Sequence, residues 1–273
     1  MNSMTEEKVL SVRSLKIGYI SGRRRFIILS GLSASASRGQ LIAVIGRNGI
    51  GKSTLLRTIA GLQPALEGEL KLSGKDLSDF SRIEMARHTG YISTEVVRVS
   101  NMIVYDLVAL GRFPHTNWIG YLDMESRSVI SEAIFKSGLQ GFEYRPVAEL
   151  SDGERQRAMI ARILAQDTGL MIMDEPTAFL DVAGRYEIIK LARDLTRNGK
   201  TIIYSTHDLN PALTNADRIW LLLKDRLIEG TPEDLLNNGA LNLIFESTEI
   251  TFDPVLKRPV IRGEKGDYLK YFL

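Results

Sequence analysis

Residues 46–54 (GRNGIGKST) carry the clearest chemistry in this sequence, because they fit the G-x-x-x-x-G-K-[ST] pattern of a phosphate-binding loop. Residues 41–45 are apolar and predict a buried strand, whereas residues 52–59 predict a helix that ends at Gly61. Glycines let successive backbone N–H groups surround an anion, and a helix N-terminus adds partial positive charge. Because a strand and a helix flank the loop, a chance glycine-rich turn explains the pattern less well than phosphate binding does.

The side chains of this loop have separate predicted tasks. We expect Lys52 to reach the outer phosphates of a nucleotide and the Ser53 hydroxyl to hold Mg²⁺. The predicted nucleotide-binding residues of the loop are Gly46, Asn48, Gly49, Gly51, Lys52, Ser53 and Thr54.

An acidic pair, Asp174 and Glu175, follows an apolar run at 170–173 that predicts a second buried strand. A carboxylate at the tip of a strand beside a phosphate-binding loop can hold Mg²⁺, and we assign this task to Asp174. Glu175 would then face the γ-phosphate and polarise the attacking water as a general base. A solvent-facing acidic turn would explain the pair alone, but not its combination with the loop.

Ser151 and Glu154 stand at the start of a helix predicted over 154–165 and have the spacing of a capping box. A cap is a sufficient structural reason for these two residues. It leaves the glycine between them, Gly153, without an explanation.

The composition limits the classes of protein. The 273 residues can form one large α/β domain or two small ones, and the net charge of +2 gives no indication of nucleic-acid binding. The absence of cysteine excludes disulfides, thiolate metal sites and cysteine nucleophiles. Residues 1–8 lack the apolar core of a signal peptide, and no apolar stretch approaches the about 20 residues of a membrane helix. We therefore expect any work at a membrane to be peripheral.

Strands and helices alternate along most of the chain, which indicates a mainly parallel sheet. Residues 101–148 differ, because 104–110 and 124–137 have helical spacing with no strand between them, and we predict a helical insertion there. Residues 21–25 predict a basic turn, and residues 248–262 predict a terminal β-hairpin. Further strands are predicted at 9–19, 26–36, 69–72, 90–92, 201–205, 219–224 and 227–229, and further helices at 82–87, at 182–197 and from Thr231 onward.

The segment LSDGERQR at 150–157 resembles the signature segment of the ATP-binding cassette (ABC) ATPases, which usually reads LSGGQ. The resemblance covers roughly residues 9–236, and the motifs follow the order of that family. It implies an α/β P-loop NTPase fold with a mainly parallel core sheet, an N-terminal antiparallel β-subdomain and a helical subdomain at about 95–160. Residues 1–239 would form the ATPase domain, and residues 240–273 a C-terminal tail.

The resemblance also implies roles for further residues. Tyr19 would stack on adenine, Asp181 of the D-loop (178–181) would couple two active sites, and His207 would contact the γ-phosphate. The signature residues would bind the γ-phosphate of an ATP held by the other subunit, and capped helix N-termini do bind anions. These signature residues are Ser151, Asp152, Gly153 and Glu154.

Two positions depart from the family pattern. Thr94 stands where the family has a glutamine, and either Thr94 or Glu95 is expected to offer an oxygen to Mg²⁺ in its place. Asp152 replaces a signature glycine. Its charge must point away from a γ-phosphate, and we expect it to turn toward the N–H groups of the helix.

Residues 109–115 (ALGRFPH) resemble a segment of the ATPases that serve iron-siderophore, haem and cobalamin importers. This resemblance implies ATP and Mg²⁺ as cofactors, a homodimer, an integral membrane permease as partner and, indirectly, a substrate-binding protein. It also implies a peripheral place at the cytoplasmic face of the inner membrane. The alternatives are an exposed helix end for Arg112 and His115, and a soluble ABC ATPase without transport, such as an iron–sulfur assembly scaffold. A P-loop kinase would need neither the signature segment nor the D-loop.

Overall fold

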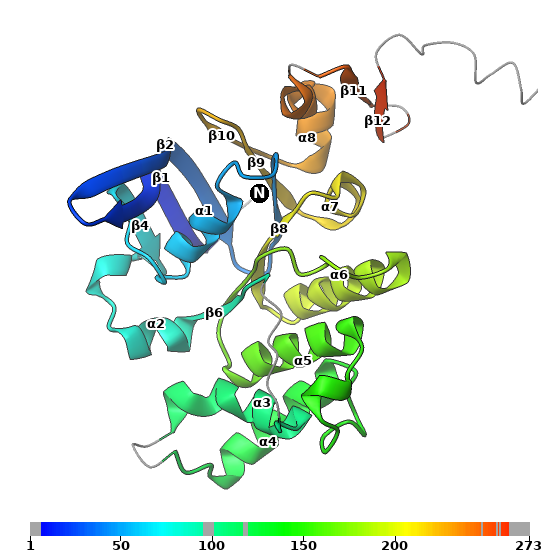
Figure 1. The fold of residues 1–273 in the computed structure, drawn as a ribbon. Helices are drawn as coiled ribbons and strands as arrows, with labels where there is room; N and C mark the ends of the chain where they lie inside the picture. The colour runs from blue at the N-terminus through cyan, green and yellow to red at the C-terminus, as the bar shows by residue number, and fades with distance from the viewer. Residues whose placement is uncertain are drawn as a thin grey trace, which may run out of the picture.

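The computed structural model describes residues 7–94, 101–116, 120–246, 248–254, 256 and 258–261. Its centre is a six-stranded sheet in the order β10-β9-β3-β8-β7-β6. All neighbouring strands in it are parallel except β9 and β10, as the alternation of strands and helices predicted (Figure 1). These strands are β3 (Leu41–Ile45), β6 (Thr89–Ile92), β7 (Leu170–Met173), β8 (Thr201–Thr206), β9 (Arg218–Leu222) and β10 (Leu227–Gly230).

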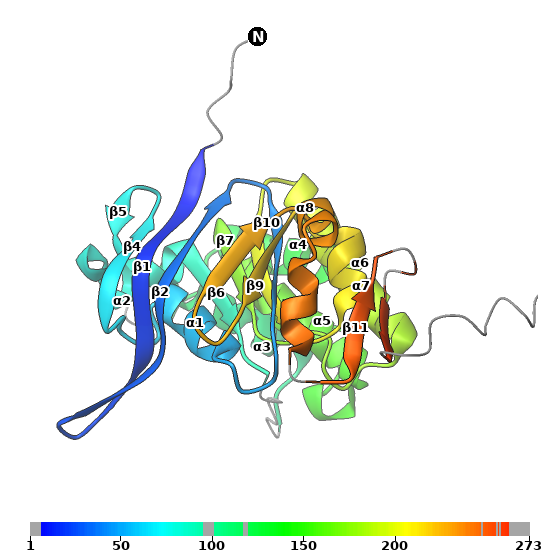
Figure 2. The same ribbon diagram turned by 90° about the horizontal axis from the view of Figure 1, so that it is seen from above.

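A second, antiparallel sheet lies beside the core sheet and has the order β2-β1-β4-β5 (Figure 2). Its strands are β1 (Lys8–Ser21), β2 (Arg24–Ser37), β4 (Glu67–Leu72) and β5 (Lys75–Asp76). The first hairpin is longer than predicted. Arg24 and Arg25, expected in a basic turn, pair with Ser21 and Ile20 as part of β2, so the turn itself is Gly22-Arg23.

The helices cover both faces of the core sheet. They are α1 (Lys52–Ile59), α2 (Arg82–His88), α3 (Val104–Ala109), α4 (Met124–Lys136), α5 (Asp152–Ala165), α6 (Val182–Arg197), α7 (Leu209–Asn215) and α8 (Pro232–Asn237). Short 3₁₀ helices are η1 (Leu77–Asp79), η2 (Leu110–His115), η3 (Val147–Glu149) and η4 (Ala240–Phe245). Helix α5 begins at Asp152, earlier than the predicted residue 154, because the capping box starts the helix directly after Ser151.

Strand β3 shows why the central strands read as continuous apolar runs. Ile42 and Val44 pack with α1 and the antiparallel sheet, whereas Leu41, Ala43 and Ile45 pack with the helices on the opposite face. All five side chains are therefore buried, because successive residues of a strand point to opposite faces and both faces are covered.

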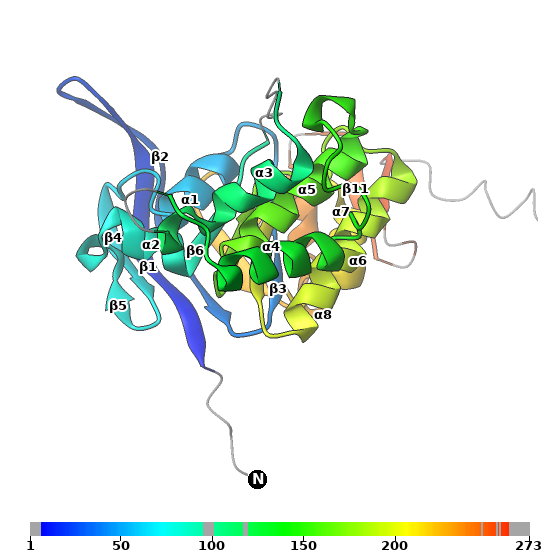
Figure 3. The ribbon, with the colours of Figure 1, turned by 90° about the horizontal axis from the view of Figure 1, so that it is seen from below.

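Helices α3, α4 and α5 pack against one another and form a helical lobe at one end of the molecule (Figures 1 and 3). The predicted helical insertion therefore exists. The alternative reading of Arg112 as part of an exposed helix end is wrong, because its side chain is only 6% exposed.

The C-terminal segment forms η4 and the antiparallel pair β11 (Ile250–Asp253) and β12 (Arg258–Ile261), which is the predicted hairpin. Leu241 and Phe252 are buried in the same core as the helices of the lobe and of the core sheet. The segment therefore packs as part of the main body. In the described part of the chain, no helix has the length and apolar character that crossing a membrane requires.

Candidate nucleotide-binding site

The phosphate-binding loop connects β3 to the N-terminus of α1 and has no room for side chains at two of its glycines. A Cβ atom at Gly46 would lie 2.6 Å from the Leu222 carbonyl oxygen, and one at Gly51 would lie 2.7 Å from Ile28 Cγ2. Gly51 also has a left-handed φ of 113°, which favours glycine. Within the described residues no side chain caps α1, so its first N–H groups point into the loop and can bind an anion.

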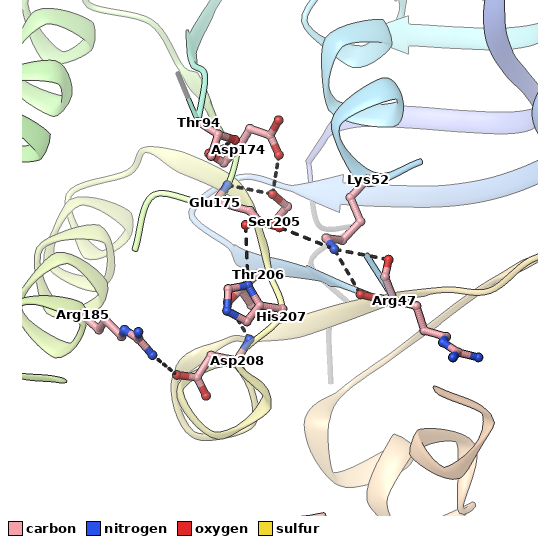
Figure 4. Close-up of polar contacts among 11 residues, drawn as sticks. Arg47, Lys52, Thr94, Asp174, Glu175, Arg185, Ser205, Thr206, His207 and Asp208 are labelled. Atoms are coloured by element: carbon pink, nitrogen blue, oxygen red, sulfur yellow. Dashed lines mark hydrogen bonds and ion pairs between the residues drawn. The ribbon is translucent and has the colours of Figure 1, made fainter. Parts of the chain in front are cut away.

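Lys52 extends along this loop with its side chain only 5% exposed. Its Nζ donates a hydrogen bond to the Gly46 carbonyl oxygen at 3.1 Å and, as Figure 4 shows, a second one to the Arg47 carbonyl oxygen at 3.5 Å. The same ammonium group lies 3.6 Å from Glu175 Oε1. The loop therefore holds the positive charge of Lys52 at its mouth, where the outer phosphates of a nucleotide would lie.

Asp174 and Glu175 follow the end of β7, and Ser205 of the neighbouring strand β8 forms a hydrogen bond with each of them. The Ser205 hydroxyl donates to Asp174 Oδ1 at 2.6 Å and accepts the backbone N–H of Glu175 at 2.8 Å. Ser205 was not among the predicted site residues. Its signal was present, because Ser205 is a buried polar residue directly after the apolar residues 202–204 of a strand that is parallel to β7.

Glu175 lies between Lys52 of the phosphate-binding loop and His207 after β8. One carboxylate oxygen faces Lys52, and the other lies 3.5 Å from His207 Nδ1 (Figure 4). Its φ of 47° lies in the left-handed region, which costs a non-glycine residue on the order of 1 kcal/mol or more. The structure thus brings together Lys52, Glu175 and His207, three residues that were predicted separately.

The surroundings of Asp174 fit a magnesium ion. Asp174 is 1% exposed, and its carboxylate offers the oxygen ligands that Mg²⁺ prefers. The Ser53 hydroxyl at the start of α1 is a second oxygen ligand. Tyr91 donates its hydroxyl to Asp174 Oδ2 at 3.4 Å. Burial, and next the charge of Asp174, raise the pKa of Tyr91, so this hydroxyl stays protonated as a donor.

Thr94 lies beside this carboxylate but uses its hydroxyl hydrogen elsewhere, because Oγ1 donates to the Asp174 backbone carbonyl at 3.1 Å. Its lone pairs are still available to a metal ion. Glu95, the other predicted ligand at this position, lies outside the described residues. Among the described residues, no three metal-ligating side chains of His, Asp or Glu gather in one place, so Mg²⁺ would need phosphate oxygens and water to complete its shell.

Tyr19 lies on β1 and is about half exposed. Its ring stacks on Phe26 of β2, with the ring centroids 5.0 Å apart and the planes at 17°. The two residues are direct partners across the strands, which is the arrangement that brings aromatic side chains together. Phe26, which covers one face of the Tyr19 ring, was not among the predicted site residues.

The signature segment forms the predicted capping box at the start of α5. Ser151 Oγ accepts the Glu154 N–H at 3.3 Å, and the Glu154 carboxylate accepts the Ser151 N–H at 2.8 Å. This backbone hydrogen bond lowers the pKa of Glu154 below its ordinary value. Asp152 does not turn to the helix N–H groups as expected, because it pairs with the Arg155 guanidinium at 2.8 Å. A cation one helical turn away supplied a stronger partner than the helix end.

Two predicted site residues, Asp181 and Asp152, make their polar contacts within the described part of the chain with other residues than Lys52, Glu175 and His207. Asp181 caps the N-terminus of α6 by accepting the Gly184 N–H at 2.8 Å. Asp152 and Arg155 of α5 line one pocket together with Thr94 and Glu175, between the core and the helical lobe.

Comparisons with known proteins agree with this geometry. The family model described as ABC transporter matches residues 29–178. The iron(3+)-hydroxamate import ATP-binding protein of Bacillus subtilis is 36% identical over 254 residues, which are 92% of this chain and 93% of that protein. The ferric enterobactin transport ATP-binding protein of Escherichia coli is 31% identical over 262 residues, which are 94% of this chain and 95% of that protein.

A solved structure is similar along most of the chain. A metal-chelate type ABC transporter in an inward-facing conformation matches with a TM-score of 0.75 and 27% identity, over 87% of this chain and 89% of that chain. A family match over more than half of the sequence, with relatives aligned along nearly its whole length, shows that this protein belongs to the ABC transporter family as an ATP-binding subunit whose ATP hydrolysis is coupled to transport.

Proposed function

We propose that this chain is the ATP-hydrolysing subunit of an importer for iron–siderophore complexes. Relatives that share about a third of its sequence are named for the import of iron hydroxamates and ferric enterobactin. The ALGRFPH segment supports the same subgroup. Haem and cobalamin remain the other cargo classes of this proposal.

The observation that carries the proposed chemistry is the convergence of Lys52, Glu175 and His207. Lys52 would neutralise the outer phosphates of ATP, and Glu175 would accept a proton from the attacking water. His207 would contact the γ-phosphate from the end of β8. Ser53 and Asp174 would hold Mg²⁺, which would supply positive charge to the phosphate oxygens when bound.

We further propose that two copies pair head to tail, so that the signature segment of each faces the ATP on the other. Gly153 supports this arrangement. Within the described residues, a Cβ atom at Gly153 would meet no heavy atom within 4 Å, so packing inside one subunit does not require a glycine there. A ligand that approaches from outside the subunit would require one.

The helical lobe would carry the surface that binds the permease. Among the described residues from 110 to 116 and from 120 to 124, large apolar side chains are exposed, and Phe113 at 74% and Met124 at 89% are the most exposed of these. Two further members are Leu110 and Tyr121. Such exposure is unusual for a monomer surface and fits contact with another protein. In this proposal the subunit lies at the cytoplasmic face of the membrane, and a substrate-binding protein acts on the far side of the permease.

Two experiments test the proposal. A tagged chain should copurify from detergent-solubilised membranes with a polytopic permease, and a deletion strain should fail to grow with a ferric hydroxamate or ferric enterobactin as its sole iron source. Growth failure on haem or cobalamin instead would move the cargo to that class. A chain that copurifies with no membrane protein would favour the soluble ATPase without transport.

A further inference from the structure

The hairpin of β1 and β2 extends beyond the rest of its sheet as an arm, by which we mean residues 19–27 (Figure 2). Strand β4 pairs with β1 only between Leu10 and Lys16, so the arm consists of two strands in the described sheet. Every residue of the arm is exposed. An isolated two-stranded hairpin is only marginally stable in water. Its own subunit therefore gives the arm little support, and a partner would supply it.

The arm is strongly basic. It carries three successive arginines, Arg23, Arg24 and Arg25, and no acidic residue. Glu67, the acid nearest to its base, is paired with Lys16 at 2.5 Å. The hydrogen bond from Lys16, and to a smaller extent the charge of Arg25, lower the pKa of Glu67. Arg23 and Arg24 form no ion pair with any acid that the structure describes, so their charges are available to another molecule.

Arg24 lies on the face of the arm that carries the stacked rings of Tyr19 and Phe26. It stands two residues before Phe26 in the same strand, and side chains alternate between the two faces of a strand. Arg25, one residue nearer to Phe26, therefore points to the opposite face. Because Tyr19 is expected to stack on adenine, a second subunit that covers this ATP would face Arg24 and not Arg25.

The loop between α4 and α5 has the opposite charge. Among the described residues, Glu143 and Glu149 form no ion pair, whereas both acids of the signature segment that follows have an arginine partner. Glu149 is exposed and stands two residues before Ser151. Tyr144 of the same loop is 84% exposed and leaves a large apolar side chain open to contact. The loop thus offers negative charge and apolar area directly before the signature segment.

The arm and this loop project on the same side of the molecule, near its two ends, and the start of α1 lies between them (Figures 2 and 3). A two-fold axis through that side would bring the arm of each copy to the loop of the other, because a two-fold interface contains each contact twice. The same axis would bring each phosphate-binding loop to the signature segment of the other copy. The two contacts would therefore form one continuous interface.

We propose that the arm of each subunit binds the loop before the signature segment of a second copy, with Arg24 paired to Glu149. The inference rests on the proposed head-to-tail pairing of two copies. It adds to that pairing a contact made by protein side chains alone, on the adenine side of the nucleotide. The dimer contains the Arg24–Glu149 pair twice, and Tyr144 packs against the apolar side chains of the arm.

Charge reversal tests this contact in the Glu175→Gln background, in which ATP-bound dimers are expected to accumulate. Arg24→Glu and Glu149→Arg should each raise the dissociation constant of the ATP-bound dimer about tenfold, because either homodimer then contains two pairs of like charge. An equimolar mixture of the two variants should recover the original affinity, since both interfaces of the mixed dimer hold opposite charges. Sedimentation velocity measures all three dissociation constants. A mixture that dimerises as weakly as its components would overturn the inference.

Arg25→Glu is the matched control, because it makes the same change of charge on the opposite face of the arm. It should alter the dissociation constant less than twofold. Equal effects of Arg24→Glu and Arg25→Glu would contradict the assigned face. Binding of the unmodified chain to vesicles with anionic phospholipid, lost equally in both variants, would assign the arm to the membrane surface instead.

ATP binding to the isolated subunit separates the contact from a role of Arg24 toward its own nucleotide. The affinity for a fluorescent ATP analogue, measured at protein concentrations too low for dimers, should be the same in Arg24→Glu and in the parent chain. A weaker affinity in Arg24→Glu would overturn the inference. If Glu175→Gln alone forms no dimer with ATP, the proposed head-to-tail pairing fails, and the arm contact fails with it.

Discussion

The Lys52 ammonium group and the Glu175 carboxylate lie 3.6 Å apart, although one opens α1 and the other follows β7. Opposite charges at this distance stabilise each other, and both groups lie at the phosphate-binding loop. His207 completes the group on the other carboxylate oxygen of Glu175. Lys52, which is expected to bind phosphate, therefore lies beside Glu175, which is expected to activate water.

Lys52→Ala should weaken ATP binding at least tenfold, because it removes charge-assisted hydrogen bonds to the outer phosphates. Equilibrium binding of a fluorescent ATP analogue measures this effect. Lys52→Arg, which keeps the charge, is the control for the fold and should bind more tightly than the alanine variant. Near-normal affinity in Lys52→Ala would remove the phosphate-binding role.

Glu175→Gln should retain ATP binding and ATP-dependent dimerisation while hydrolysis falls by roughly 10² to 10⁴. The amide keeps the size of the side chain but cannot accept a proton from water. Phosphate release and size-exclusion chromatography with ATP measure the two properties. A fast Glu175→Gln variant would exclude this residue as the base.

Thr94→Val should raise the Mg²⁺ concentration needed for half-maximal ATPase activity several-fold. The change keeps the shape of the side chain but removes the hydroxyl that donates to the Asp174 carbonyl at 3.1 Å. Glu95→Gln is the paired variant and should have a smaller effect in the same titration. The reverse order would show that Glu95 takes the place of the family glutamine.

Arg155→Met should weaken ATP-dependent dimerisation, measured in the Glu175→Gln background. Without its partner at 2.8 Å, the Asp152 carboxylate would repel the γ-phosphate that the signature segment is proposed to face. Adding Asp152→Gly should restore dimerisation, because it removes the unpaired charge. If the combined variant dimerises as weakly as Arg155→Met alone, the guanidinium does not act by neutralising Asp152.

Phe252→Ala should lower the free energy of unfolding by about 3–5 kcal/mol, the usual cost of removing a buried phenylalanine. Phe252 is 4% exposed and packs in the main core, beyond the predicted end of the ATPase domain at residue 239. Urea denaturation measures the change. Leu256→Ala, at an exposed position of the same hairpin, is the control and should change stability little.

Much of the fold and part of the site follow from local signals. The strand at 41–45 and the helices at 52–59 and 182–197 have the predicted bounds, since apolar runs, glycines and caps are read from neighbouring residues. The capping box of Ser151 and Glu154 is equally local.

The sequence by itself therefore determined the phosphate-binding loop, the acidic pair and the order of the elements. Tertiary structure alone decided that Ser205 holds both acids, that Phe26 stacks on Tyr19 and that Arg112 is buried against α5. Each of these contacts joins residues from different strands or helices. The order of the strands in a sheet, and the carbonyl group that a buried arginine contacts, depend on packing between segments far apart in the chain. No short stretch of sequence contains this information.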